Sequence, residues 1–341
     1  MNRTVILVNP ASGGASNAWD LFEPRVLESL GDASCEIEWT KKGEIRSQVE
    51  SFLARGVDKI VLIGGDGTVS DVASSLFSTS GEWLGNQISI GIIPFGRGND
   101  FFRTLAGKSM ISEKNRLKLA LGAIEKKMAR EVDVVRVDFF DKNKKLLSRR
   151  ALVNVSSFGY GGRVVQRAKD RVGILGRSFL GATGLAYLLQ TITGLPEVSP
   201  TNVRITGDGQ IVFEGPLFSG FFLNGRFNAG GVEWLKGCHI DDGFLDLIAF
   251  EWQSREKFIV RLPQWLKELP FRWWKNVPGV TVGSARKWDI ELSDIASEMP
   301  TTSETGEKTS FIEVDGDPIE NSAITSISME CVHRAMKVWS L

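Results

Sequence analysis

The sequence predicts an α/β unit followed by a mostly antiparallel β unit, and two observations carry this prediction. In the first third of the 341 residues, short apolar runs alternate with helical patterns. Beyond a helix near residues 115–127, strands joined by turns replace the alternation. Alternating strands and helices indicate a parallel sheet covered on both faces, with ligand loops at the carboxyl ends of its strands.

The first unit contains four apolar runs that we predict as strands. In chain order they are TVILVNP, CEIEWT, DKIVLIGG and ISIGIIP, and the helical patterns between them include AWDLFEPRVLESL and EIRSQVESFLARG. The predicted strand ends carry Asn9-Pro10, Thr40, Gly64-Gly65-Asp66 and Pro94-Phe95-Gly96. We assign residues 1–130 to this unit and expect the segment 322–341 to return to it.

The second unit, residues 131–321, is predicted from runs that end in turns. These runs are EVDVVRVDFF, RRALVNVSSFG, TNVRITGDGQIVFEG, LFSGFFLNG and GFLDLIAF. The Gly-Asp-Gly within the third run predicts a hairpin turn. We expect one helical insertion at about 164–193 and, because residues 301–309 are polar and lack periodicity, a surface loop there.

Composition and charge bound the classes of function. Lysine plus arginine equal aspartate plus glutamate at 41 each, so the zero net charge gives no overall attraction to nucleic acid. Three cysteines, Cys35, Cys238 and Cys331, lie far apart without the spacing of a zinc site or a disulfide framework. We expect reduced thiols in a cytoplasmic protein, and the N-terminal apolar run is too short for a signal peptide.

The stretch VLIGGDGTVSDVA places Gly64, Gly65, Asp66 and Gly67 between a buried strand and a helix. Glycines let a ligand approach the backbone closely, and the following helix directs free N–H groups and its positive dipole end at the same spot, which suits a phosphate. Asp66 would repel that phosphate unless a cation such as Mg²⁺ lies between them. The stretch therefore predicts a site for a metal-bound nucleotide.

Two further strand ends have similar turns. NPASGG offers the Asn9 amide and consecutive backbone N–H groups, and PFGRGND adds Arg97 and Asn99 to a glycine-rich turn. Because the ends of parallel strands meet at one edge of a sheet, the three turns predict a single nucleotide site.

These motifs resemble those of the diacylglycerol kinase catalytic-domain family, which includes bacterial lipid kinases, sphingosine kinases and ceramide kinases. The resemblance spans nearly the whole chain, and its five motifs in order are NPASGG, GGDGT, GIIPFGRGNDFFR, HIDDGFLDL and VDGD. It implies a β-sandwich-like second domain with ATP and Mg²⁺ in the cleft between the domains. The implied reaction transfers the γ-phosphate to the hydroxyl of diacylglycerol or a related lipid alcohol, as a step of lipid metabolism.

The resemblance also implies roles for single residues. Asp66 is similar to the acid that organises Mg²⁺, and Asp133 to an acid at the domain junction that joins the Mg²⁺–water network. The expected ATP contacts are Asn9, Ser12, Thr40, Gly65, Gly67, Thr68, Arg97 and Asn99. In HIDDGFLDL, we expect Asp242 to bind a second, structural Mg²⁺ together with backbone carbonyls near His239 and Phe244.

Asp315 is the expected general base, because VDGD resembles the family motif that supplies it and because FIEVDGD predicts a strand that ends in a turn. Two positions depart from the family pattern. Asp317 stands where many relatives have glutamate, which leaves its role as a second acid open. Arg97 stands where many have threonine, and its guanidinium offers a bidentate phosphate clamp.

Because a lipid acceptor must reach the site from a membrane, we expect peripheral contact at the inner membrane face, and the sequence offers two surfaces for it. One is the uncharged segment 178–195, whose glycines and polar side chains argue against a spanning helix. The other is the segment 263–279, where tryptophans such as Trp265 and Trp274 alternate with cations. A homodimer is a further expectation.

Two alternatives to the lipid kinase stay open. An NAD kinase-like enzyme has related turn chemistry, although it gives no evident use to the aromatic segments. A catalytically inactive nucleotide-binding regulator is the other, because Arg97 and Asp317 depart from the family pattern.

Overall fold

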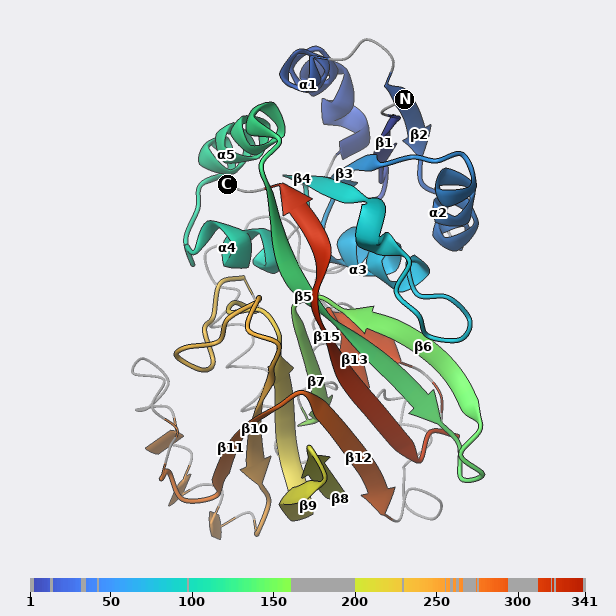
Figure 1. Cartoon of the computed structure of the whole chain (residues 1–341). Helices are drawn as coiled ribbons and strands as arrows, with labels where there is room; N and C mark the ends of the chain where they lie inside the picture. Colours follow the sequence, from blue (N-terminus) through green and yellow to red (C-terminus); the bar gives the residue numbers. More distant parts are fainter. Residues whose placement is uncertain are drawn as a thin grey trace.

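The structure is a computed structural model of the chain. It describes residues 3–12, 15–31, 35–41, 43–96, 98–160, 200–228, 230–254, 256–257, 260–261, 264–265, 274, 276–293, 312–319, 321 and 323–339. The predicted insertion at 164–193, the surface loop at 301–309 and Arg97 lie outside this set. Two units lie one above the other along a shared sheet (Figure 1).

The first unit alternates strands and helices, as predicted. Its elements are β1 (Thr4–Val8), α1 (Ala15–Leu30), β2 (Glu36–Trp39), α2 (Ile45–Ala54), β3 (Lys59–Gly64), α3 (Asp66–Ser75), the short 3₁₀ helix η1 (Gly85–Gln87), β4 (Ser89–Pro94), α4 (Asp100–Ala106) and α5 (Glu113–Lys126). The strands are parallel in the order β2, β1, β3, β4. Helix α1 packs against α5, and α2 packs against α3. Among the helices of the described residues, none has both the length and the apolar character needed to cross a bilayer.

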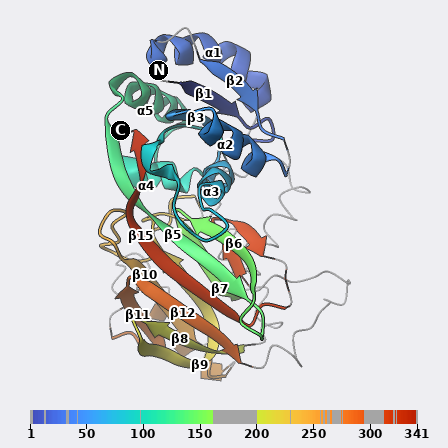
Figure 2. The same ribbon diagram turned by 45° about the vertical axis from the view of Figure 1, so that its right-hand side comes forward.

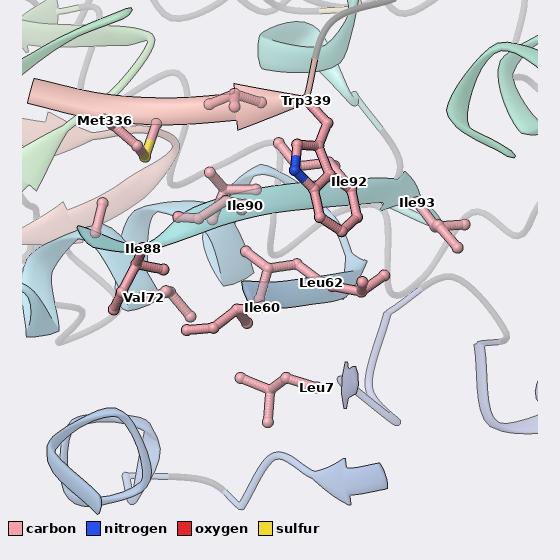
Figure 3. Close-up of a cluster of buried hydrophobic side chains, with 14 of the residues drawn as sticks. Leu7, Ile60, Leu62, Val72, Ile88, Ile90, Ile92, Ile93, Met336 and Trp339 are labelled. Atoms are coloured by element: carbon pink, nitrogen blue, oxygen red, sulfur yellow. The ribbon is translucent and has the colours of Figure 1, made fainter. Parts of the chain in front are cut away.

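Burial on both faces explains why β1 and β3 form parallel strands. All five residues of β1 are buried, and β3 is buried from Ile60 to Gly64. Continuous apolar runs of this kind are typical of a parallel sheet covered by helices. In Figure 3, Trp339 lies over β4 between Ile90 and Ile92. Only glycine fits beneath this indole, because a Cβ on Gly91 would lie 2.4 Å from Trp339.

The second unit is antiparallel. Its strands are β5 (Ala129–Phe140), β6 (Leu146–Leu152), β7 (Val155–Gly159), β8 (Thr201–Gly207), β9 (Gln210–Leu223), β10 (Leu245–Glu251), β11 (Val280–Ala285), β12 (Lys287–Ser293), β13 (Ile312–Val314), β14 (Asp317–Ile319) and β15 (Ser326–Trp339). The predicted hairpin turn between β8 and β9 is present, with φ of 46° at Asp208 and 83° at Gly209. Trp288 lies fully buried in this unit and donates its indole N–H to the Leu245 carbonyl at 2.8 Å.

The long strands β5 and β15 join the two units (Figure 2). They pair antiparallel from Phe140–Ser326 to Ala129–Trp339. One half of β15 pairs with β12 of the β unit, and its other end pairs in parallel with β4 of the α/β unit. A single sheet therefore runs through both units. The predicted class, α/β plus β, is confirmed.

A bulge interrupts the pairing of β5 with β15. Val332 pairs with Val134, but the next pair is Met336 with Val132, so three residues of β15 lie opposite Asp133. Arg334 in this bulge has φ of 50°. The bulge turns two donors toward the Asp133 carboxylate, which is described below.

Candidate functional site

Three turns meet at the carboxyl ends of β1, β3 and β4, as the sequence predicts. The Asn9 amide donates to the Thr68 hydroxyl at 2.7 Å, which links the first turn to the start of α3. Its side-chain oxygen accepts from Ala11 N at 3.0 Å and shapes the turn after β1. Ser12 N donates to the Asn9 carbonyl, and Thr40 N donates to the Val8 carbonyl, so both predicted ATP contacts stand beside this turn.

The second and third turns touch through their glycines. A Cβ on Gly65 would lie 2.7 Å from the Gly96 Cα, and a Cβ on Gly96 would lie 2.5 Å from the Gly65 Cα. Phe95 N also donates to the Gly64 carbonyl at 2.8 Å. Backbone meets backbone here, so neither position has room for a side chain.

We expect Gly65→Ala to weaken ATP binding at least tenfold, because the new methyl must push the two turns apart. Calorimetric titration with ATP measures this change. Gly122→Ala is a matched control, since its Cβ meets no atom within 4 Å and alanine favours the helix interior. ATP binding by Gly65→Ala at the wild-type affinity would contradict the placement of the nucleotide at these turns.

The Asp66 carboxylate caps α4 from a different element. Its oxygens accept from Asp100 N at 3.1 Å and Phe101 N at 3.0 Å. Burial raises the pKa of Asp66, and the backbone N–H groups oppose that rise. Asp66 therefore holds the third turn against the second, in addition to its expected role in binding a cation.

Asn99 shapes the third turn through its own backbone and side chain. It has φ of 51°, and its side-chain oxygen accepts from Gly96 N at 2.8 Å. Its amide donates back to the Gly96 carbonyl at 2.5 Å. The sequence predicts Asn99 as an ATP contact. These hydrogen bonds show that Asn99 also stabilises the conformation of the turn.

A second buried acid, Asp100, lies beside Asp66 and was missed by the sequence analysis. Its Oδ2 accepts from Gly230 N at 2.9 Å, while Oδ1 accepts no hydrogen bond from the residues that the structure describes and lies 3.5 Å from Arg103 Nε. Burial and the charge of Asp66 raise the pKa of Asp100 to about 6. The available signal was an acid directly after the turn, at the start of a helix.

The hairpin of β13 and β14 brings the late acidic motif to α3. Asp315 has φ of 50° and is 9% exposed. Its carboxylate accepts from Val153 N at 2.9 Å, Asn154 N at 2.8 Å and Val155 N at 3.2 Å. Burial raises the pKa of Asp315 to about 7, although these N–H groups favour the charged form.

Asp317 faces the GGDGT turn from the same hairpin. Its Oδ2 lies 3.6 Å from the position that a Cβ on Gly67 would occupy. The neighbouring acid, Asp315, adjoins the Ser70 side chain of α3. The structure thus brings residues from opposite ends of the chain to the beginning of one helix.

The Asp133 and Asp242 carboxylates have other hydrogen-bond partners than the acids of this group. Asp133 is fully buried, and it accepts from Gly243 N at 2.7 Å, Arg334 N at 2.6 Å and the His333 ring at 2.9 Å. These bonds tie β5 to the bulge of β15 and to the HIDDG turn. Asp242 is exposed and accepts from Phe244 N at 3.0 Å.

The predicted structural Mg²⁺ at Asp242 stays a prediction. Within the part of the chain that the structure describes, no three His, Cys, Asp or Glu side chains are grouped to hold a metal. The role of Asp133 near Mg²⁺ also stays a prediction, because its carboxylate accepts hydrogen bonds from the β15 bulge and the HIDDG turn.

Fold and site together define a class of protein. It is a protein of two units, one α/β and one β. At one edge of its parallel sheet, glycine turns and a helix N-terminus have the features of a phosphate-binding site, and buried carboxylates lie beside them. The family profile described as "Diacylglycerol kinase catalytic domain" matches residues 3–137. The chain belongs to the diacylglycerol kinase catalytic-domain family, and the predicted resemblance is confirmed.

Two curated relatives support this membership. "Probable lipid kinase YegS-like" of Xanthomonas campestris pv. campestris is 31% identical over 238 residues, which cover 69% of this chain and 70% of the relative. "Diacylglycerol kinase" of Bacillus subtilis is 29% identical over 266 residues, covering 76% and 77%. Against several other lipid kinase relatives, the match spans 62% of their length.

Solved structures support the fold. A diacylglycerol kinase from Bacillus anthracis superposes with a TM-score of 0.69 at 22% identity, covering 100% of this chain and 97% of that one. Yeast NADH kinase is more distant, with a TM-score of 0.50 at 10% identity and coverage of 99% and 83%.

Proposed function

We propose that the chain is an ATP-dependent lipid kinase that transfers the γ-phosphate to the hydroxyl of diacylglycerol or a related lipid alcohol. The observation that carries the proposal is the contact between the acidic hairpin and the GGDGT turn, where Asp317 faces Gly67. A phosphoryl acceptor and a phosphate site must adjoin, and this contact puts carboxylates next to the turn where phosphates fit. Family membership and the names of the relatives point to the same chemistry.

The turns would bind the nucleotide phosphates through backbone N–H groups and the N-terminus of α3. The acids beside them fit Mg²⁺, because Asp100 Oδ1 is buried and accepts no hydrogen bond from the described residues, and because a Cβ on Gly98 would lie 3.0 Å from Asp100 Oδ2 and 3.1 Å from Asp66 Oδ2. Asp66 and Asp100 would hold the ion, which when bound neutralises charge on the phosphates. One or two carboxylates suffice for this, since Mg²⁺ takes its remaining ligands from water and phosphate.

Asp315 would accept the proton of the lipid hydroxyl. Its pKa of about 7 matches this task, because a general base works best when its pKa lies near the working pH. The three N–H groups around its oxygens hold the carboxylate in one orientation. Asp317, closer to the GGDGT turn, would position the acceptor or a metal-bound water.

We expect the purified chain to transfer label from γ-³²P-ATP to diacylglycerol in mixed micelles when Mg²⁺ is present, and not after EDTA treatment. Thin-layer separation of a lipid panel identifies the labelled product. Label in NADP, with the lipids unlabelled, would support the NAD kinase-like alternative and contradict the proposal. ATP binding without turnover on any acceptor would support the inactive regulator.

A further inference from the structure

A hollow of about 380 Å³ lies between α5 and the linker that joins α4 to it. Its floor includes Ile111, Leu119 and Ala123, and these side chains also pack against the core of the α/β unit. Its rim carries Lys108, Lys118 and Lys126. The hollow therefore combines an apolar floor with a basic edge. We call it the α5 hollow.

The lysines at the rim of the α5 hollow are exposed. Met110 is 83% exposed at its edge. Among the described residues, none forms an ion pair with Lys108, Lys118 or Lys126, whereas Arg55, for comparison, pairs with two glutamates. Residues 108–128 contain six lysines and arginines and two glutamates in a chain of zero net charge. Such a surface complements an anionic partner with an apolar layer.

Helix α4 connects the α5 hollow to the candidate site. Asp100 begins this helix and Lys108 follows its end, and seven residues of helix span about 10 Å. Arg103 donates to the Gly98 carbonyl of the third turn and to the Ser109 carbonyl of the linker. A Cβ on Gly231 would lie 2.4 Å from that same Ser109 oxygen, so the linker also touches the second unit. A surface bound at the hollow would thus lie at the far end of the helix that begins in the candidate site.

We propose that the α5 hollow is the docking surface for an anionic lipid bilayer, an inference that rests on the proposed lipid kinase function. The lysines would contact lipid phosphates while Met110 enters the boundary between headgroups and acyl chains. A second copy of the chain fits less well, because a two-fold contact would set lysines against lysines.

The aromatic segment 263–279 gives less support to membrane contact where the structure describes it. Trp265 and Trp274 are 5% and 2% exposed. Their indole N–H groups donate to the Pro278 and Trp234 carbonyls, so both rings belong to the core of the β unit. The rest of that surface, and the whole segment 178–195, lie outside the described residues.

Vesicle sedimentation without nucleotide tests the docking surface. We expect the chain to bind vesicles of phosphatidylcholine and phosphatidylglycerol, but not vesicles of phosphatidylcholine alone, and to dissociate as salt is raised. Lys108→Glu with Lys118→Glu should weaken binding at least about 30-fold, since each lysine near an anionic bilayer contributes about 1 kcal/mol and 1.4 kcal/mol is tenfold. Met110→Asp should weaken it as well.

Lys142→Glu with Lys145→Glu is the matched control, because it makes the same charge change on exposed residues of the β5–β6 turn, far from α5 (Figure 1). Equal losses in both pairs, or wild-type binding by the α5 pair, would overturn the proposal. The proposal would also be overturned if the chain does not bind vesicles but binds an acidic peptide, or if it does not bind vesicles but dimerises in light-scattering measurements.

Failure of docking and failure of the kinase proposal are distinguishable. The α5 pair should phosphorylate diacylglycerol in non-ionic micelles like the wild type but lose activity on vesicles. Full activity of the α5 pair on vesicles would overturn docking alone. If the wild type binds vesicles through the α5 hollow but labels no lipid in micelles, the kinase proposal fails while the docking surface stands.

Discussion

Asp315→Asn is expected to lower kcat by about 10²- to 10⁴-fold while the affinity for ATP stays near that of the wild type. The carboxylate lies on the hairpin that faces α3, and it accepts hydrogen bonds from the 153–155 backbone and adjoins Ser70, which follows the GGDGT turn. Single-turnover transfer to diacylglycerol beside calorimetric titration with ATP separates the two effects. Loss of ATP affinity in step with kcat would place Asp315 in the phosphate site.

The pH dependence of kcat provides a second test of Asp315. Because a base must be deprotonated, kcat should rise with pH through about 7, and this limb should disappear in Asp315→Asn. Stability should change in the opposite direction. The pKa of Asp315 rises from 3.8 to about 7 on folding, so the folded state binds its proton more tightly, and this contribution to stability is fully present below pH 3.8 and is lost as pH rises from there through about 7.

Asp317→Asn is the matched variant for the same experiment. It removes a carboxylate two residues away that faces Gly67. If Asp317→Asn abolishes the rise of kcat with pH and Asp315→Asn retains this rise, the base is Asp317. Circular dichroism of both variants shows whether the hairpin remains folded.

Asp66→Asn is expected to lower Mg²⁺-dependent turnover by about 10²-fold or more, because even the residues that support metal ligands contribute 10- to 100-fold. The substitution should also lower Tm. Asparagine has one acceptor oxygen, and its amide would face one of the two N–H groups at the start of α4. Turnover measured across a Mg²⁺ titration, together with thermal unfolding, records both effects.

Gly107→Ala separates these two effects of Asp66→Asn. Gly107 ends α4 with φ of 65°, so alanine strains the other end of the same helix and leaves the carboxylates in place. We expect Gly107→Ala to lower Tm while turnover keeps its Mg²⁺ dependence. Near wild-type kcat in Asp66→Asn, with an unchanged Mg²⁺ requirement, would contradict the assignment of Asp66 to the ion.

The parts of the site that are local in the chain were predictable from the sequence. Glycines after a buried strand mark the turns, and parallel strands place their ends at one edge, so the meeting of Asn9, Gly65 and Gly96 follows from the pattern. The acids of VDGD were also found, through the family resemblance. The shared sheet was expected only as a return of the C-terminal segment.

Contacts between distant segments escaped the sequence analysis. The carboxylate of Asp315 meets backbone N–H groups about 160 residues earlier, and Asp100 meets Gly230 N at a separation of 130 residues. A backbone N–H donor does not depend on the type of its residue, so no sequence pattern indicates which N–H groups bind these carboxylates. The capping of α4 by Asp66 could not be predicted for the same reason. Every residue type except proline would present the same backbone N–H group at positions 100 and 101.

The position of β15 has a consequence for the order in which the chain folds during synthesis. This strand follows every other described element, yet it supplies Met336, Val338 and Trp339 to the core of the α/β unit and Ile327 and Met329 to that of the β unit. Domains usually fold one after the other as they leave the ribosome. Here the nascent α/β unit lacks β15, which pairs with β4 on the side away from β3, until residue 339 has emerged. We therefore expect both halves to complete their folding together, after translation of β15.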